Sequence, residues 1–282
     1  MLTFANDSNR CWFLAALQAI LHVPQIANVL REDSVFEKML YKKRKNASDF
    51  ACELASIAKK YWSSFEDEGT HEVSTLLDIF TKINRNFSGR KMYDSSECFI
   101  KMIETLETAF VQKPPFSLPE TCNKIAWEEY STKNPSTFMS DIFLGQAQVE
   151  HDDGDITFEH FTGIVISESS PSVARGIAEF LNDPSTKTKK SVTKFPLVLP
   201  IIFQKTANKS FVNYEISLDF SGIRYELFAV LLHVGGCHWM TLAKSPIGWN
   251  LFDDSNMRKI DDINSIIQKD AMLLLYKRIS TD

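Results

Sequence analysis

Three residues of this sequence have the types and the order of a nucleophile, a base and a group that orients the base. Cys11 lies near the start of the chain, His238 lies far downstream, and Asp253 follows in the run WNLFDD at 249–254. A thiol, an imidazole and a carboxylate together can carry out nucleophilic acyl transfer. A cysteine alone is more often a small buried hydrophobe, so the prediction of a nucleophile depends on the distant histidine and aspartate.

Cys11 stands where a polar loop changes into an apolar helix. The apolar residues that follow it recur at helical spacing: Phe13, Ala16, Leu17, Ile20 and Leu21. Because Pro24 disfavours continuation, the pattern predicts a helix that begins at about Cys11. The unpaired N–H groups of a first helical turn favour a thiolate, so we expect a lowered thiol pKa, which Arg10 would lower further. The upstream amides of Asn6 and Asn9 could meet a developing oxyanion.

Both regions resemble the cysteine and histidine boxes of the ubiquitin-specific proteases, which are papain-like deubiquitinases. The cysteine box of that family has asparagines five and two residues before the nucleophile, where Asn6 and Asn9 stand, and a Leu-Gln pair after it, here at 17–18. The histidine box corresponds to YELFAVLLH at 225–233, HW at 238–239 and WNLFDD at 249–254. The resemblance spans nearly the whole chain. It implies an α+β fold of the papain-like cysteine protease type, with a helical thumb and a β-sheet palm.

The resemblance also implies a reaction, the hydrolysis of the bond after the C-terminal glycine of ubiquitin. Cys11 would attack the carbonyl carbon, His238 would hold the thiolate and protonate the leaving amine, and Asp253 would fix the imidazole. Asn6 and the backbone N–H of Cys11 would stabilise the oxyanion. Asp254 would form a hydrogen bond near that oxyanion.

Asp94 has two interpretations. Asp94 and Glu97 form an Asp-x-x-Glu version of the capping box, which predicts the start of a helix and needs no further role. The segment also resembles the family's box in which an aspartate holds the extended ubiquitin tail, which implies a substrate-binding role for Asp94. The resemblance further places His233 in the loop before the catalytic histidine, and Trp239 with Trp12 in an aromatic wall where the family has tyrosines.

The region after Ile142 changes to short strands, at the point where the family has fingers with two zinc-binding C-x-x-C pairs. The five cysteines here are scattered, and none forms such a pair. We therefore predict shortened, zinc-free fingers, a tight turn at 150–155, and no metal or other cofactor. His151 and His160 lie near acidic residues but have no cysteine partners.

The other elements follow from hydrophobic period. Helices are predicted from about 47, over 73–80, from 94 and over 173–181, and strands over 156–166, 195–203, 211–218, 225–234, 238–243, 249–252 and 271–276. Residues 183–190 read as a solvated linker. We predict a single catalytic domain over 1–282, with a helical thumb-like part at 1–140 and a β-rich palm with shortened fingers at 141–282.

Composition limits the partners. The 282 residues carry 31 basic and 36 acidic side chains, a net charge of −5, which argues against nucleic acid and favours a basic partner such as ubiquitin. Scattered cysteines indicate a reducing compartment, so we expect a cytoplasmic or nuclear protein. We also expect a monomer. The basic run at 42–45 fits either a solvated loop or a nuclear localisation signal. We interpret the apolar stretch 11–30 as a core helix, with no membrane contact, because polar residues such as Gln18 interrupt it.

Three alternative functions stay open. A protease for another ubiquitin-like modifier, SUMO-like or Nedd-like, would keep the same catalytic residues but change the finger and tail contacts. A catalytically inactive ubiquitin-binding scaffold and a different cysteine acyltransferase are the others. Cys237 stands where the family has a glycine before the catalytic histidine, and the loop from His233 to His238 is short. Both departures lie where the tail must thread.

Overall fold

The computed structural model describes residues 2–63, 69–89, 91–111, 122–133, 136–204 and 211–279. The chain forms two compact units: Met1–Gln112 with Phe228–Met272, and Lys113–Leu227 with Leu273–Asp282. All the residues with predicted chemistry fall in the first unit: Asn6, Cys11, Asp94, His233, His238, Trp239, Asp253 and Asp254. The predicted organisation as one catalytic domain, with parts at 1–140 and 141–282, stays a prediction.

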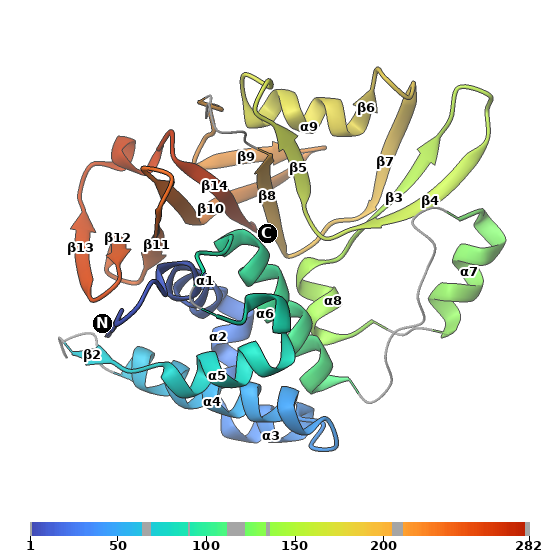
Figure 1. Ribbon diagram of the computed structural model, residues 1–282. Coiled ribbons are helices and arrows are strands. Elements are labelled where there is room, and N and C mark those ends of the chain that lie inside the picture. The colour runs from blue at the N-terminus through green and yellow to red at the C-terminus, as the bar shows by residue number, and fades with distance from the viewer. Residues whose placement is uncertain are drawn as a thin grey trace. The chain divides into compact units, whose positions relative to one another are not determined.

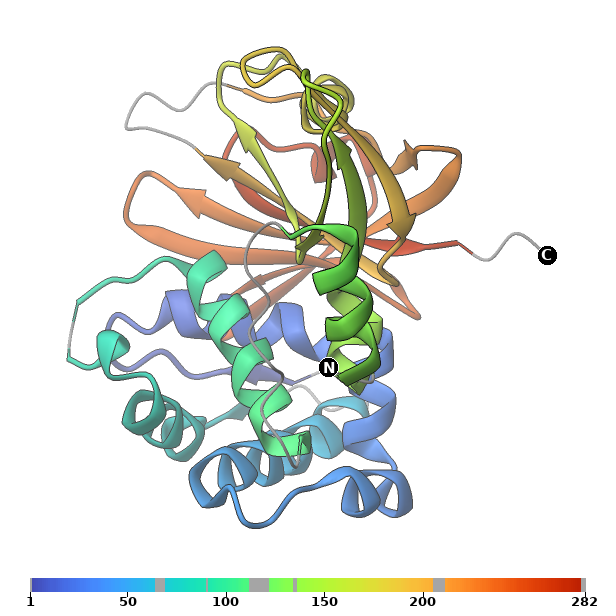
Figure 2. The ribbon, with the colours of Figure 1, turned by 90° about the vertical axis from the view of Figure 1, so that its right-hand side faces the viewer.

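Helices dominate the N-terminal part of the first unit (Figure 1). They are α1 (Cys11–Leu21), α2 (Pro24–Arg31), α3 (Asp33–Met39), α4 (Lys45–Ser63), α5 (Ser74–Ile83), the 3-10 helix η1 (Arg85–Phe87) and α6 (Ser95–Phe110). The helices predicted from about 11, from about 47, over 73–80 and from 94 are therefore confirmed as α1, α4, α5 and α6. Both α1 and α4 pack against α6 (Figure 2).

The prediction of one core helix through the apolar stretch 11–30 is wrong. Two helices, α1 and α2, occupy it and are bent by 84° at the break between them. The cause is Pro24 at the first position of α2, where its missing N–H costs nothing and its ring prevents α1 from continuing. Within the described residues no single helix has the length and apolar character to cross a membrane, although this bent pair passes by length and composition together.

The C-terminal part of the first unit is an antiparallel sheet in the order β13-β12-β11-β10. Its strands are β10 (Ile223–Val234, of which Phe228–Val234 lies in this unit), β11 (His238–Ser245), β12 (Gly248–Asp253) and β13 (Asn256–Ile260). A short parallel pair, β1 (Thr3–Phe4) with β2 (Thr70–His71), and the 3-10 helix η2 (Ile263–Ile266) complete the unit. Strands β10, β11 and β12 are confirmed predictions, whereas the short, polar edge strand β13 has no apolar alternation and was not predicted.

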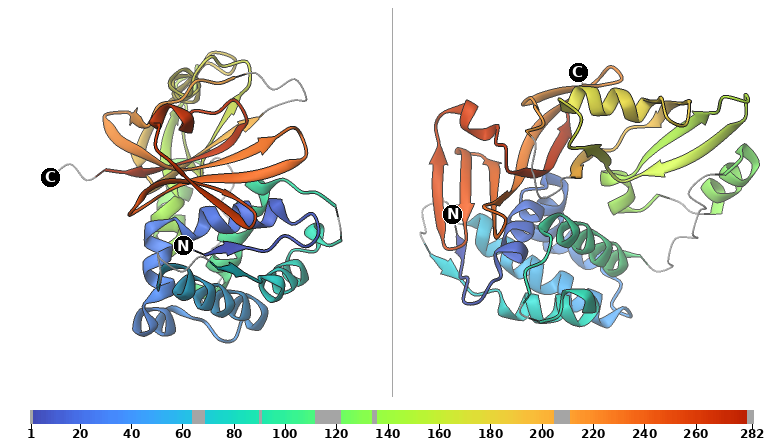
Figure 3. Two further views of the ribbon diagram at one scale, coloured as in Figure 1. Left: turned by 90° about the vertical axis from the view of Figure 1, so that its left-hand side faces the viewer. Right: turned by 45° about the horizontal axis from the view of Figure 1, so that its top comes forward.

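Helix α1 packs against β11 (Figure 3), and all its side chains are buried. A buried hydrogen bond joins the two elements, because the hydroxyl of Thr241 on β11 donates to the main-chain oxygen of Ala15 at 2.8 Å. Ala15 is one turn after Cys11, and Thr241 is three residues after His238. This contact therefore sets the position of the predicted nucleophile relative to the strand that carries the predicted base.

The second unit contains two further groups of strands. One is a four-stranded sheet in the order β4-β3-β7-β6, made of β3 (Gly145–Glu150), β4 (Ile156–Phe161), β6 (Asn182–Asp183) and β7 (Thr188–Lys194). In the other, β8 (Val198–Gln204) pairs with β5 (Ile164–Ser167) and β14 (Ala271–Arg278), while β9 (Ser217–Phe220) pairs with the first residues of β10. Its helices are α7 (Lys124–Lys133), α8 (Phe138–Phe143) and α9 (Val173–Leu181).

Several predictions in the second unit are confirmed and three are wrong. Helix α9, strands β8 and β14, and the turn at 150–155 lie where predicted. The strand predicted over 156–166 is divided into two, because β4 pairs with β3 in one sheet and β5 pairs with β8 in another. Gly163 lies between them, where an added Cβ would come within 3.0 Å of Pro200 O. Residues 183–190 are not a linker, because they contain the end of β6, a turn and the start of β7. The strand predicted over 211–218 is reduced to β9.

The buried hydrogen bond between α1 and β11 generates a stability prediction. Thr241→Val keeps the side-chain shape and removes the second donor of the Ala15 carbonyl, which keeps its helical hydrogen bond, so the free energy of unfolding should fall by about 0.5–1.5 kcal/mol. Thr108→Val is the matched control, because the Thr108 hydroxyl donates to Glu104 O at 2.9 Å on an exposed helix face where water can replace it. Urea denaturation of both variants measures the difference. Equal losses in the two variants would contradict a special role for the Thr241 contact.

Candidate active site

His238 and Asp253 meet at one end of the sheet. His238 is the first residue of β11 and Asp253 the last residue of β12, and the antiparallel pairing of these strands puts both at the same end. The distance from His238 Nε2 to Asp253 Oδ1 is 2.6 Å. If Asp253 is ionised, Nε2 carries the proton, and Nδ1 presents its lone pair. The imidazole can therefore act as a base through Nδ1 while the carboxylate holds its orientation.

Cys11 is the first residue of α1 and is only 3% exposed. The N–H groups of Phe13 and Leu14 bond to the carbonyl of Arg10, which closes the first turn. The backbone N–H groups of Trp239, Trp12 and Cys11 itself act on the sulfur and favour its thiolate form. Trp239 follows His238 directly, so the structure brings the predicted nucleophile against the main chain beside the predicted base.

The expected lowering of the thiol pKa is wrong. Burial is the largest effect and raises the pKa of the Cys11 thiol, and the negative charge of Asp254 raises it further. The backbone N–H groups at the sulfur act in the opposite direction but do not outweigh burial. Arg10 does not help as expected, because its guanidinium donates to the Ser74 hydroxyl at 3.2 Å and lies 4.0 Å from Asp7. The resting cysteine is thus a thiol that needs a base.

Asn6 is held by hydrogen bonds at both ends of its amide. Its oxygen accepts from the N–H of Arg10 at 2.9 Å, and its Nδ2 donates to Asp254 Oδ2 at 2.8 Å. The second hydrogen of Nδ2 is left for another acceptor. Asn9 and Asp254 both have positive φ, 47° and 51°, a strained backbone for residues other than glycine that often marks functional sites.

Asp254 has an unusual environment for a carboxylate. Oδ2 accepts from Asn6, whereas Oδ1 is buried and has no hydrogen-bond partner among the residues that the structure describes. Its charge acts on the Cys11 thiol. Asp254 can therefore orient the Asn6 amide, at the cost of disfavouring negative charge on the neighbouring sulfur.

Asp94 caps α6. Its Oδ1 accepts from the N–H groups of Ser96 at 2.7 Å and Glu97 at 3.1 Å, so the capping interpretation is confirmed. The side chain is exposed, which leaves Oδ2 accessible to a ligand. Beside this cap, the ring of Trp12 packs on Tyr93 and Phe87, with centroid distances of 4.9 and 5.4 Å. Neither Tyr93 nor Phe87 was predicted at the site, and the irregular sequence around them gives no periodic signal.

His233 and Trp239 face each other across the β10–β11 hairpin. They are register partners, and their rings stack with centroids 4.4 Å apart and planes at 11°. The loop between the strands is only three residues long, and Gly235 and Gly236 take positive φ values there. Cys237 completes that loop and is exposed. Trp239 and Trp12, where an aromatic wall was expected, are each only 3% exposed, so both rings lie largely beneath the surface of the site.

Metal binding has one geometrically possible location among the described residues. His238, Asp253 and Asp254 offer ligand atoms within 4.8 Å of one another. In this structure Nε2 and a carboxylate oxygen of that set already bond to each other, which is the arrangement of a base and its orienting group.

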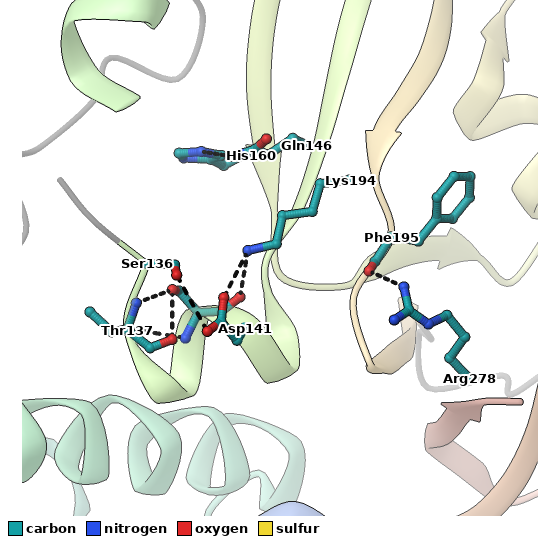
Figure 4. Close-up of polar contacts among 9 residues, drawn as sticks. Ser136, Thr137, Asp141, Gln146, His160, Lys194, Phe195 and Arg278 are labelled. Atoms are coloured by element: carbon teal, nitrogen blue, oxygen red, sulfur yellow. Dashed lines mark hydrogen bonds and ion pairs between the residues drawn. The ribbon is translucent and has the colours of Figure 1, made fainter. Parts of the chain in front are cut away.

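The two histidines near the predicted fingers each contact a neutral side chain. His151 Nε2 lies 2.8 Å from the Thr157 hydroxyl, and His160 Nε2 lies 3.3 Å from Gln146 Nε2 (Figure 4). Burial, followed by the charge of Lys194, lowers the pKa of His160 to about 4. Lys194 itself bonds to Asp141 at 3.3 Å. These contacts account for both histidines without a metal role.

Comparison with known proteins identifies the family. The family model described as ubiquitin carboxyl-terminal hydrolase matches residues 3–276, so the chain belongs to this family. Two mouse relatives, the ubiquitin carboxyl-terminal hydrolase 17-like proteins B and E, are 22% and 23% identical to it over 96% and 98% of this chain. The chain spans 62% and 56% of the length of these two relatives. The predicted membership of the deubiquitinase family is confirmed.

Solved structures show the same fold. The SAGA Ubp8/Sgf11/Sus1/Sgf73 DUB module bound to ubiquitin aldehyde contains a chain that matches with a TM-score of 0.78 and 17% identity, covering 100% of this chain and 70% of that chain. A structure of the module bound to monoubiquitin gives a TM-score of 0.76 at 17% identity and the same coverages. The predicted α+β fold of the ubiquitin-specific protease type is confirmed by this likeness.

The charge of Asp254 generates a prediction about thiol reactivity. Asp254→Asn can still accept the hydrogen bond from Asn6 but removes the charge that raises the thiol pKa. Alkylation of Cys11 by iodoacetamide at pH 7 should then be about three- to tenfold faster, which corresponds to a pKa lower by one unit or less. Peptide mass spectrometry follows the Cys11 peptide separately from the other cysteines.

The matched control is Asp7→Asn, an exposed carboxylate that is close in sequence but not among the groups that shift the thiol pKa. It should leave the alkylation rate unchanged. Slower alkylation in Asp254→Asn would show that Asp254 supports the thiolate rather than opposing it.

Proposed function

We propose that this chain is an active thiol-dependent deubiquitinase that cleaves the bond after the C-terminal glycine of ubiquitin. The observation that carries the proposal is the 2.6 Å hydrogen bond between His238 and Asp253, while the backbone of Trp239, the residue after His238, acts on the Cys11 thiol. Family membership supports the reaction class. An inactive scaffold would have no need of an imidazole oriented by a carboxylate.

The reaction begins with transfer of the thiol proton. His238 Nδ1 accepts it from Cys11, and the sulfur forms a bond to the carbonyl carbon as the π electrons move to oxygen. The high thiol pKa makes this transfer necessary, and Asp253 stabilises the imidazolium that results. The free hydrogen of Asn6 Nδ2 and the N–H of Cys11 are the donors for the oxyanion.

Collapse of the tetrahedral intermediate completes acyl transfer. The C–N bond breaks, and the imidazolium of His238 gives its proton to the leaving amine, which leaves a thioester on Cys11. His238 then activates water, which attacks the thioester carbonyl and releases the ubiquitin carboxylate and the thiol. Asp254 acts only through the orientation of Asn6, because its charge opposes both the thiolate and the oxyanion.

Three residues are assigned to substrate. Asp94 offers its exposed Oδ2 to the main chain of the extended tail. Trp239 is only 3% exposed, so Trp239 and His233, whose rings stack, act by shaping the β10–β11 hairpin beside which the tail would pass. A net charge of −5 supports attraction to the basic tail side of ubiquitin. In this assignment the enzyme acts as a monomer in a reducing cytoplasmic or nuclear environment, where Cys11 stays reduced.

A protease for a SUMO-like or Nedd-like modifier is the second candidate, favoured by the compact β3–β4 hairpin, which leaves less surface for the body of a modifier. Reporters with the same C-terminal fluorophore on ubiquitin, SUMO and Nedd8 test the two proposals. We expect the highest kcat/KM with ubiquitin. A higher kcat/KM with another modifier would keep the chemistry and replace the substrate.

The catalytic roles generate two linked expectations. Cys11→Ala should abolish cleavage of the ubiquitin reporter while ubiquitin binding is retained. Asp253→Asn should lower kcat by about two to four orders of magnitude, because the imidazole loses its orienting charge. The control is Asp254→Asn, measured in the same assay. If it lowers kcat more than Asp253→Asn does, the third catalytic residue is Asp254.

The substrate role of Asp94 can be separated from its capping role. Asn is as good an N-cap as Asp, so Asp94→Asn should leave the melting temperature unchanged, whereas Asp94→Ala should lower it. With ubiquitin as substrate, both variants should raise KM on the order of tenfold for one lost charge-assisted contact. A KM for Asp94→Asn within twofold of the original would leave Asp94 as a cap alone.

The fingers are proposed to be shortened and free of zinc. The β3–β4 hairpin closes with Glu150 opposite Ile156, and Cys122 is the only cysteine of the second unit. Prolonged treatment with a chelator should therefore change neither the melting temperature nor the activity. Stoichiometric zinc in the purified protein, found by elemental analysis, would contradict this prediction.

A further inference from the structure

A histidine at the far end of α1 is not used by the proposed mechanism. His22 follows the last residue of α1 and is 4% exposed. Its Nδ1 lies 2.7 Å from the main-chain oxygen of Gln18, and its Nε2 lies 3.4 Å from the Tyr61 hydroxyl. A carbonyl can only accept, so Nδ1 carries the proton and Nε2 accepts from Tyr61. His22 is therefore held as a neutral imidazole in one tautomer.

The ring of His22 packs against the strand that carries Asp253. Its centroid lies 5.4 Å from that of Phe252, the residue immediately before Asp253. Tyr61 and Trp62 hold the ring from α4, with centroid distances of 5.6 and 5.2 Å. Trp62 also donates its indole N–H to Leu21 O at 3.1 Å. The C-terminal end of α1 is thus joined to Phe252 through a ring that cannot turn freely.

Three contacts along one face of α1 fix the helix on β11 and β12. At its start the Cys11 sulfur lies near the backbone N–H of Trp239, one turn later Ala15 O accepts from Thr241, and at its end the His22 ring packs on Phe252. Residues 11, 15 and 22 lie on the same side of a helix with 3.6 residues per turn. Thr241 and Phe252 are register partners, so the last two contacts are made to one rung of the sheet. A helix held only near its start could still pivot, and the contact at His22 removes that freedom.

We propose that His22 is a positioning residue for the reaction, acting through Phe252 on Asp253 and through α1 on Cys11. The proposal rests on the proposed function, because it assumes that Cys11, His238 and Asp253 react together. The polar partners at the ring are uncharged: the Gln18 carbonyl and the Tyr61 hydroxyl. Burial lowers the pKa of His22 to about 4, so the ring stays neutral near neutral pH.

The test compares His22→Leu and Phe252→Leu with a control elsewhere in the core. Phe50→Leu is the control, because Phe50 is fully buried on α4 and packs on Phe80 rather than on β12. The melting temperature, kcat and KM on a ubiquitin-amide reporter, and the pH dependence of Cys11 alkylation are measured for each. Enzyme concentrations are corrected by titration with ubiquitin that carries a C-terminal electrophile, so that an unfolded fraction does not count as lost kcat.

All three variants should melt at lower temperature, but only two should lose catalysis. His22→Leu and Phe252→Leu should lower kcat on the order of tenfold, as a misplacement of well under an ångström implies, with KM within about twofold. Their Cys11 alkylation should need higher pH, because the imidazole stabilises the thiolate less well. The double variant should lose less than the product of the two single losses, since both act through one contact. Phe50→Leu should keep the original kcat and alkylation profile.

A normal corrected kcat and a normal alkylation profile in His22→Leu would overturn the proposal and leave His22 as a core residue only. If His22→Leu does not fold, His22→Phe keeps a ring on Phe252 and loses only the hydrogen bonds, and Phe252→Leu tests the same contact from the other side. Failure of the proposed function gives a different result, because the unaltered protein would then not cleave the reporter. The alkylation profiles would in that case still decide whether His22 positions Cys11.

Discussion

The packing of α1 against β11 is the contact on which the site depends. Packed between β11 and α6, the helix buries six large apolar side chains, each worth about 1.5–3 kcal/mol relative to exposure: Trp12, Phe13, Leu14, Leu17, Ile20 and Leu21. The same helix buries the Gln18 amide, for which no hydrogen-bond partner is found among the described residues, at a cost of about 1–3 kcal/mol. The free energy gained by apolar burial is several times larger than this cost, so α1 remains stable with polar side chains on one buried face. That face carries Cys11 at one end and His22 at the other.

The burial that holds the nucleophile in place also sets its protonation. A helix N-terminus favours an anion by about 0.3–1 kcal/mol, whereas desolvation can shift a pKa by up to about 3–5 units, which is several kcal/mol. Burial therefore outweighs the helix N-terminus at Cys11, and the nearby charge of Asp254 adds to burial. A cysteine that is protonated at rest depends on His238, and the orientation of His238 by Asp253 becomes a requirement for reactivity.

Much of the first unit could be predicted from the sequence because its elements are long and strongly periodic. Helices α1, α4 and α6 and strands β10 to β12 show the helical or alternating pattern of half-buried elements. The capping role of Asp94 was readable because an aspartate followed by a glutamate three residues later is a local signal. The family boxes predict Cys11, His238 and Asp253 as the catalytic residues, and the structure places His238 and Asp253 in hydrogen-bond contact.

The remaining features depend on tertiary contacts that leave no local signal. The raised thiol pKa follows from burial and from the charge of Asp254, which is far away in sequence. The contact of Thr241 with Ala15 could have been suspected only from a polar residue at an inward-facing strand position. The division of 156–166 into β4 and β5 follows from strand pairing, because β4 lies beside β3 in one sheet and β5 beside β8 in another. Short polar strands such as β13 are formed by pairing rather than by pattern.

The most direct measurement of the central claim is the site of reaction with ubiquitin that carries a C-terminal electrophile. Cys52 and Cys237 are exposed, whereas Cys11 is buried, so simple accessibility favours the first two. We predict a single adduct, located by peptide mass spectrometry on Cys11, that forms much more slowly when His238 is replaced by alanine. An adduct on Cys52 or Cys237, or an adduct on Cys11 that forms equally fast without His238, would contradict the account.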